Sequence, residues 1–268
     1  MKRHDIEYIG GNFIVWNRES FFQAINVFAF AILIAVNGLA GSTTVLGGVT
    51  SADVSNMYPT LITPAGFTFA IWGVIYFLLL LFAVYQLLPK NRDQPFLSQV
   101  GLLFALSSTF NISWLFLWHY NYITYSLVLM FALLASLILI YLRLGIGKTA
   151  VSLREMAFVH LPFSVYLGWI SIATIANVSV ALTAAGWDGW GIEPSTWAVV
   201  IICVALLLSL AVLATRKDLA YSFVIAWALL GILSNQSGHE SIVLSSEIGI
   251  VLLLAAIVVT VASSRLKR

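Results

Sequence analysis

Charged residues are scarce in this chain, and cysteine is almost absent. Charged residues make up 9% of the 268 positions and hydrophobic residues 61%, so too few polar groups remain to cover a water-soluble domain. The single cysteine, Cys203, excludes an intrachain disulfide and a cysteine-based metal cluster. Gly-x-Ser-x-Gly, His-Glu-x-x-His and phosphate-loop patterns are also missing. The composition indicates an integral membrane protein and disfavours a nucleic-acid partner.

Long apolar runs are what the chain has in abundance. A hydrocarbon core about 30 Å thick needs roughly 20 helical residues to cross it. Runs near that length are expected at Phe21–Gly41, Pro64–Leu88, Phe96–Trp118, Tyr122–Leu144, Met156–Ala184, Thr196–Ala214, Leu219–Gln236 and Ile242–Ala262. The sequence therefore predicts an all-α, polytopic bundle of eight transmembrane helices.

The positions of the basic residues support this count. Threading the eight runs alternately through a membrane places all 13 Lys and Arg residues on one side. Because cytoplasmic loops carry the Lys/Arg excess, both termini are expected in the cytoplasm. A bacterial inner (plasma) membrane is the expected location, since no transit peptide is recognised.

Aromatic and amide residues recur at helical spacing in three of the predicted spans. They are Phe69, Trp72 and Tyr76 in the second span, Asn111 and Trp114 in the third, and Tyr166, Trp169, Ala173 and Asn177 in the fifth, where Ser171 is also found. A single Trp or Tyr is commonly an interface anchor or a packing residue. An amide within an apolar run, however, needs a partner on a neighbouring helix or in a cavity. These faces are therefore predicted to share one interior.

The fifth span carries the most specific pattern. Trp169, Ser171, Ala173, Thr174 and Asn177 form a Trp-x-Ser-x-Ala-Thr-x-x-Asn sequence, which resembles the tryptophan-rich sensory protein, or translocator protein (TspO), family. The second and third spans resemble the same family through Pro64, Phe69, Trp72 and Tyr76, and through Asn111 and Trp114. The resemblance covers roughly residues 20–185. It suggests a cytoplasmic segment at 1–20, a five-helix bundle at 21–185 and a three-helix extension at 186–268.

The resemblance implies a cavity that binds a flat hydrophobic ligand, such as a tetrapyrrole, a sterol or an isoprenoid, in a sensory or translocator role. The expected binding residues are Phe69, Trp72, Tyr76, Asn111, Trp114, Tyr166, Trp169, Ser171, Ala173 and Asn177. No cofactor is required and no metal site is assigned, while a porphyrin is a candidate ligand. The expected partners are membrane lipids and a hydrophobic small molecule, and a homodimer is a candidate assembly.

Two alternatives remain open at this stage. Glu247 is forced into the last span, near Asn235, and a carboxylate inside a membrane is a candidate proton or cation site, as in a proton-coupled secondary transporter. The other alternative, implied by the resemblance, is a membrane enzyme that degrades porphyrin in light.

Overall fold

The computed structural model describes residues 18–42 and 45–266, and every regular element within these ranges is helical. The long helices are α1 (Arg18–Ser42), α3 (Ile71–Leu87), α5 (Leu103–His119), α6 (Ile123–Arg143), α8 (Leu161–Ala184), α9 (Pro194–Arg216), α10 (Leu219–Asn235) and α11 (Glu240–Leu266). The short elements are α2 (Ser51–Met57), η1 (Gly66–Ala70), η2 (Pro89–Asn91), α4 (Pro95–Val100), α7 (Leu153–Glu155), η3 (Met156–His160) and η4 (Gly189–Gly191). The predicted all-α class is thereby confirmed, whereas most of the expected N-terminal segment 1–20 lies outside the described residues.

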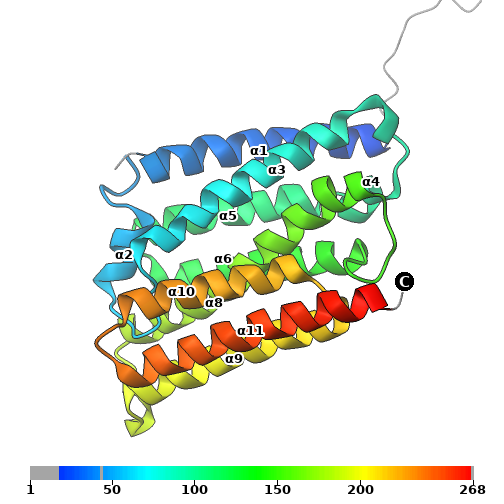
Figure 1. The fold of residues 1–268 in the computed structure, drawn as a ribbon. Helices are drawn as coiled ribbons and strands as arrows, with labels where there is room; N and C mark the ends of the chain where they lie inside the picture. The colour runs from blue at the N-terminus through cyan, green and yellow to red at the C-terminus, as the bar shows by residue number, and fades with distance from the viewer. Residues whose placement is uncertain (1–17, 43–44, 267–268) are drawn as a thin grey trace, which may run out of the picture.

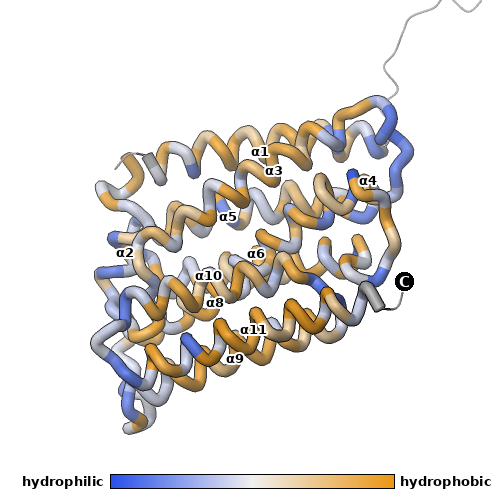
Figure 2. Tube along the Cα trace, viewed as in Figure 1, coloured by the Kyte–Doolittle hydropathy of each residue, from blue (hydrophilic) through white to orange (hydrophobic). Residues whose placement is uncertain are grey.

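Six of the helical segments in the described part of the chain are long and apolar enough to cross a membrane. Apolar residues run along the helices, and hydrophilic residues collect where the helices end (Figure 2). A bundle with apolar outer faces is stable in lipid because each helix satisfies its own backbone hydrogen bonds. The chain is therefore an integral membrane protein built from helices.

The remaining two predicted spans are not among these six, although α10 matches its predicted range to within one residue. The helix α10 has 17 residues, and the run predicted as one helix over Phe96–Trp118 is divided into α4 and α5 at Gly101. Gly101 has a φ of 50°, a left-handed conformation that glycine adopts without steric cost. The prediction of a continuous third span was wrong for this reason.

The helices run side by side between two ends of the molecule (Figure 1). One end, called here the basic end, holds the start of α1 and the end of α11, with Lys90, Arg92, Arg143, Lys148, Arg154, Arg216 and Lys217 in or beside its connections. The opposite end, called the loop end, holds α2 and the α8–α9 connection. The helix α1 lies at one edge of the bundle and α9 with α11 at the other, while α8 packs on α6, α3 and α10.

The helix α10 is tied to the segment that leads into α3. The hydrogen bonds run from Ala65 N to Gly231 O (2.9 Å), from Trp227 Nε1 to Thr68 O (3.0 Å), from Asn235 Nδ2 to Thr63 O (3.1 Å) and from Gln236 Nε2 to Thr63 O (3.2 Å). They satisfy backbone groups in a stretch that forms no α-helix of its own. The seventh predicted span, α10, therefore belongs to the same helix bundle as the first five predicted spans.

Candidate functional site

Tryptophans from three helices meet inside the bundle. The ring centroids of Trp72 on α3 and Trp114 on α5 lie 6.2 Å apart, and those of Trp72 and Trp169 on α8 lie 6.1 Å apart. Phe69 makes an edge contact with Trp169 at 6.1 Å, and Tyr76 stacks on Trp72 at 5.5 Å. These separations are typical of favourable aromatic pairs. The three aromatic faces predicted from the sequence thus contact one another.

A chain of hydrogen bonds joins four helices behind Trp72. The Tyr76 hydroxyl donates to Asn37 Oδ1 (2.6 Å), Asn37 Nδ2 donates to Asn111 Oδ1 (3.0 Å), and Asn111 Nδ2 donates to the Tyr166 hydroxyl (3.0 Å). Asn111 is fully buried, where an unpaired amide would be costly. Through these bonds Tyr76, Asn111 and Tyr166 hold the helices together, and none of the three lines the cavity beside the tryptophans.

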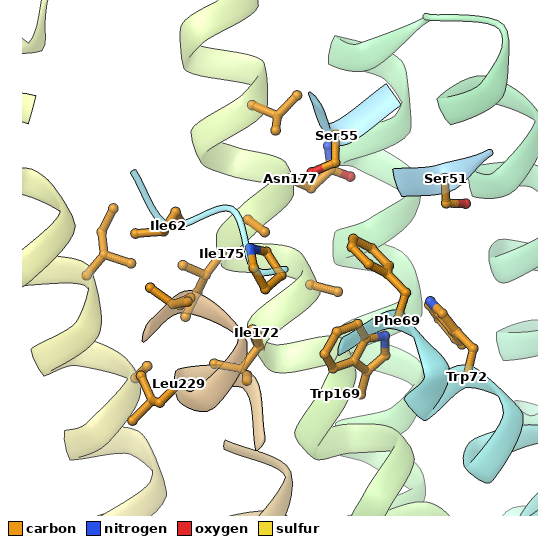
Figure 3. Close-up of a pocket in the computed structure, with 18 of the residues that line it drawn as sticks. Ser51, Ser55, Ile62, Phe69, Trp72, Trp169, Ile172, Ile175, Asn177 and Leu229 are labelled. Atoms are coloured by element: carbon orange, nitrogen blue, oxygen red, sulfur yellow. The ribbon is translucent and has the colours of Figure 1, made fainter. Parts of the chain in front are cut away.

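A cavity of about 60 Å³ lies beside the tryptophans. Of the expected binding residues, six line it: Phe69, Trp72, Trp114, Trp169, Ala173 and Asn177. In Figure 3, Phe69, Trp72 and Trp169 stand together on one side of this cavity. The aliphatic side chains of Ile62, Ile172 and Leu229 lie on the other side. Aromatic and aliphatic walls therefore face each other across the space.

The cavity is small in this conformation. Its volume of about 60 Å³ is well below the roughly 300–1,000 Å³ of typical small-molecule sites. Phe69 lies on the 3-10 helix η1 and Trp72 in the first turn of α3, and a 3-10 segment has weaker hydrogen-bond geometry than an α-helix. Hydrogen bonds from Ala65 N to Gly231 O and from Trp227 Nε1 to Thr68 O fasten this part of the cavity wall to α10.

Trp169 supplies an unused hydrogen-bond donor in the cavity wall. Its side chain is 3% exposed, and Nε1 has no hydrogen-bond partner. Buried indole N–H groups are ordinarily bonded, because leaving one unpaired costs free energy. Of the buried polar atoms found without a partner in the described residues, this one belongs to the cavity lining.

Asn177, by contrast, is already occupied by protein partners. Its Oδ1 accepts from Trp114 Nε1 (2.9 Å), and its Nδ2 donates to Ser126 Oγ (3.3 Å). Ser171 Oγ donates to Leu167 O in its own helix (2.8 Å), and Ser171 is not among the cavity-lining residues. The polar contacts expected from these two side chains are thus directed to the protein.

The short helix α2 covers the loop end of the cavity with Ser51 and Ser55. Thr50 and Asp53 form a reciprocal cap at its start, with Thr50 N donating to the Asp53 carboxylate (2.8 Å). The two hydrogen bonds from Thr50 lower the pKa of Asp53. Trp118 Nε1 then donates to Ser51 O (3.2 Å), which fastens α2 to α5.

Neither Glu247 nor Asn235 lines the cavity. Glu247 is exposed on α11 and lines neither this cavity nor the groove between α8 and α9. Asn235 Nδ2 donates instead to Thr63 O. In the described residues no carboxylate lines the cavity, and Asn235 helps to hold α10 to the segment before η1.

Sequence reasoning missed two parts of the site. Asn37 on α1 joins Tyr76 to Asn111, and its position as an amide within an apolar run was a signal that could have found it. The second part is the wall supplied by the last three helices, made of Ile201, Ile202 and Ala205 on α9 and of Ala228, Leu229 and Ile232 on α10. No local pattern marks those aliphatic residues, because they resemble every other apolar position.

An all-helical, polytopic membrane protein with a small tryptophan-walled cavity is the class that this fold and site define. The chain belongs to the TSPO-like protein family, whose model matches residues 23–263. This confirms the resemblance seen in the sequence, and the match continues beyond residue 185 to include α9, α10 and most of α11. No curated protein and no solved structure matches the chain.

Proposed function

We propose that this protein binds a flat hydrophobic ligand inside the helix bundle and acts as a membrane sensor or translocator. The observation that carries the proposal is the unpaired Nε1 of Trp169 in the cavity wall. A ligand with an oxygen acceptor on the edge of a ring would satisfy this donor, while Trp72 and Phe69 offer faces for stacking. Tetrapyrroles, sterols and ring-bearing isoprenoids all belong to this class.

Binding requires the cavity to enlarge. Since about 60 Å³ cannot hold such a ring, Phe69 and Trp72 must separate from Trp169 as the ligand enters. The new ring would replace the contacts between these side chains, so that little stacking energy is lost. The site therefore changes from protein–protein to protein–ligand aromatic contacts.

Quenching of tryptophan fluorescence by protoporphyrin IX, measured in nanodiscs, tests the proposal. We expect saturable quenching, and Trp169→Phe should weaken the affinity by about 2- to 10-fold, because one hydrogen bond contributes about 0.5–1.5 kcal/mol. Trp190→Phe is the matched control, because Trp190 is 75% exposed and lies in the α8–α9 connection. An absence of saturation, or equal midpoints for the two variants, would contradict the proposed site.

We further propose that the chain crosses a bacterial plasma membrane eight times with its basic end in the cytoplasm. The alternating directions of the long helices and the basic residues at one end support this orientation. In a Cys203→Ser background, a membrane-impermeant maleimide should label Ser237→Cys on intact cells. It should label Lys148→Cys after permeabilisation and not before. The reverse pattern, or labelling of both before permeabilisation, would overturn the orientation or the count.

A further inference from the structure

A second and larger hollow lies beside the cavity, on the side of the last three helices. It is a groove of about 620 Å³, within the range of typical small-molecule sites. Its walls come from the segment before η1 (Pro59, Thr60, Leu61, Ile62), from α8 (Ile175, Val178, Ser179, Leu182, Thr183), from the α8–α9 connection (Trp187, Asp188, Gly189, Ile192) and from α9 (Pro194, Trp197, Ala198, Ile201, Val204). The groove exists because α9 packs mainly on α10 and α11, and so leaves α8 uncovered near the loop end.

The groove is elongated along the two helices. Its α8 wall extends over residues 175–183 and its α9 wall over residues 194–204, about 12 and 15 Å at 1.5 Å per residue. Most of the side chains along these walls are aliphatic, unlike the aromatic wall of the cavity. A long, narrow aliphatic surface fits an extended hydrocarbon chain better than a rigid disc.

Two indoles, those of Trp187 and Trp197, line the groove at its loop end. The ring centroids of Trp187 and Trp197 lie 5.3 Å apart, and Trp197 Nε1 donates to Gly189 O (2.9 Å). Asp188 Oδ1 accepts from Trp190 N (2.9 Å). No Lys or Arg lines the groove, so the walls offer no cation to an anionic head group. The lining chemistry favours an uncharged chain.

Three isoleucines join the groove to the cavity. Ile62, Ile175 and Ile201 line both spaces, and they come from three separate segments of the chain. A chain attached to a ring in the cavity would therefore pass between these side chains and lie directly along α8 and α9. The aromatic cavity and the aliphatic groove form two adjoining compartments of different chemistry.

We infer that the ligand is a flat ring that bears a hydrocarbon chain, with the ring beside Trp169 and the chain in the groove between α8 and α9. This inference rests on the proposed function and names its ligand class, which is that of prenylated quinones and similar ring-and-chain isoprenoids. A ring carbonyl would accept from Trp169 Nε1. The helix α9, one of the last three helices, would then serve to build the compartment for the hydrocarbon chain.

Two probes that differ only in whether the ring carries a hydrocarbon chain test the inference. They are 2-methyl-1,4-naphthoquinone and the same ring carrying a four-isoprene chain, titrated by fluorescence quenching in nanodiscs of one lipid composition. Comparing variants with the unaltered protein for each probe cancels the unequal partitioning of the two probes into lipid. Val204→Trp fills the groove, because Val204 is one of the lining residues. Val200→Trp, one turn earlier on α9, is its control. Val200 is 44% exposed and Val204 is 45% exposed, but Val200 does not line the groove.

We expect Val204→Trp to weaken binding of the chain-bearing probe by about tenfold, through loss of buried chain contacts, and to leave the ring-only probe within about twofold. Val200→Trp should leave both affinities unchanged. If Val204→Trp folds poorly, Ser179→Phe on the facing wall of α8 is the second test, and it should weaken binding of the chain-bearing probe in the same way. Equal effects of Val204→Trp and Val200→Trp, with the ring-only probe still bound, would overturn the chain site alone. Saturable binding of neither probe would overturn the ring site and, with it, the inference.

Discussion

Replacing Gly231 with alanine is expected to destabilise the protein by about 1–3 kcal/mol, the usual cost of overpacking a filled interior. A Cβ at this position would lie 2.9 Å from both Cβ and Cγ2 of Thr68, and Thr68 is fully buried. The gain in helix propensity, about 0.5–1 kcal/mol, is too small to offset that cost. A thermal unfolding scan in detergent should show a lower apparent Tm, by roughly 2–4 °C per kcal/mol.

Gly73→Ala provides the matched control for this change. Gly73 also lies inside a helix, α3, but a Cβ there would meet nothing within 4 Å. We expect this variant to be neutral or slightly stabilised. Adding Thr68→Ala to Gly231→Ala should restore part of the stability, because it removes the methyl and the unpaired hydroxyl of Thr68. An unchanged Tm for Gly231→Ala would show that α10 does not press on η1 as described.

The contact between Gly231 and Thr68 also determines the shape of the site. The helix α10 carries Ala228, Leu229 and Ile232 into the cavity, and the segment leading into α3 carries Ile62 and Pro64. A displacement of α10 would therefore widen the cavity from the aliphatic side. The quenching titration with protoporphyrin IX should then show a changed midpoint in Gly231→Ala, while Gly73→Ala keeps that of the unaltered protein.

Much of the fold was predictable because each helix must satisfy its own backbone groups in lipid. The seventh run was expected at Leu219–Gln236, and α10 spans Leu219–Asn235. The break at Gly101 was not predictable from hydropathy, because a glycine within an apolar run is compatible with a continuous helix. Gly101 has a positive φ where α4 packs on α1 and α6 and where Asn26 Nδ2 donates to Gly101 O (3.0 Å), and local sequence does not encode such contacts between distant segments.

The candidate site was predictable in part for a similar reason. Helical periodicity placed Trp72, Trp114 and Trp169 on inward faces, and the structure brings their rings together. Periodicity could not tell which polar groups the protein satisfies itself. Asn111 and Asn177 were expected to face a ligand, yet both are bonded to other side chains, and the unpaired donor is Trp169 Nε1. Hydrogen-bond partners depend on helix rotation and depth, which only the folded bundle defines.

Replacing Asn111 with leucine is expected to cost about 2–4 kcal/mol of unfolding free energy. The change removes the central member of the chain Tyr76–Asn37–Asn111–Tyr166 and two hydrogen bonds of 3.0 Å. It also leaves the buried Tyr166 hydroxyl without its partner, at about 1–3 kcal/mol for an unsatisfied group, whereas the half-buried Asn37 amide keeps its bonds to Leu33 O and to the Tyr76 hydroxyl. Individual hydrogen bonds between membrane helices average about 0.6 kcal/mol, so most of the loss would come from the Tyr166 hydroxyl left unpaired.

A double-mutant cycle separates these contributions. Tyr166→Phe removes the acceptor of the Asn111 Nδ2 bond, and its effect should add less than fully to that of Asn111→Leu, since the two residues share a bond. Thr109→Ala is the control, because Thr109 lies on α5 like Asn111 but is exposed and bonds within that helix, to Ala105 O. The effect of Thr109→Ala on the unfolding free energy should stay within about 0.5 kcal/mol. Full additivity of Asn111→Leu and Tyr166→Phe, or equal losses for Asn111→Leu and Thr109→Ala, would mean that this chain of side chains does not couple the four helices. If the coupling is found, the helices that carry Trp72, Trp114 and Trp169 are held in register by groups outside the cavity.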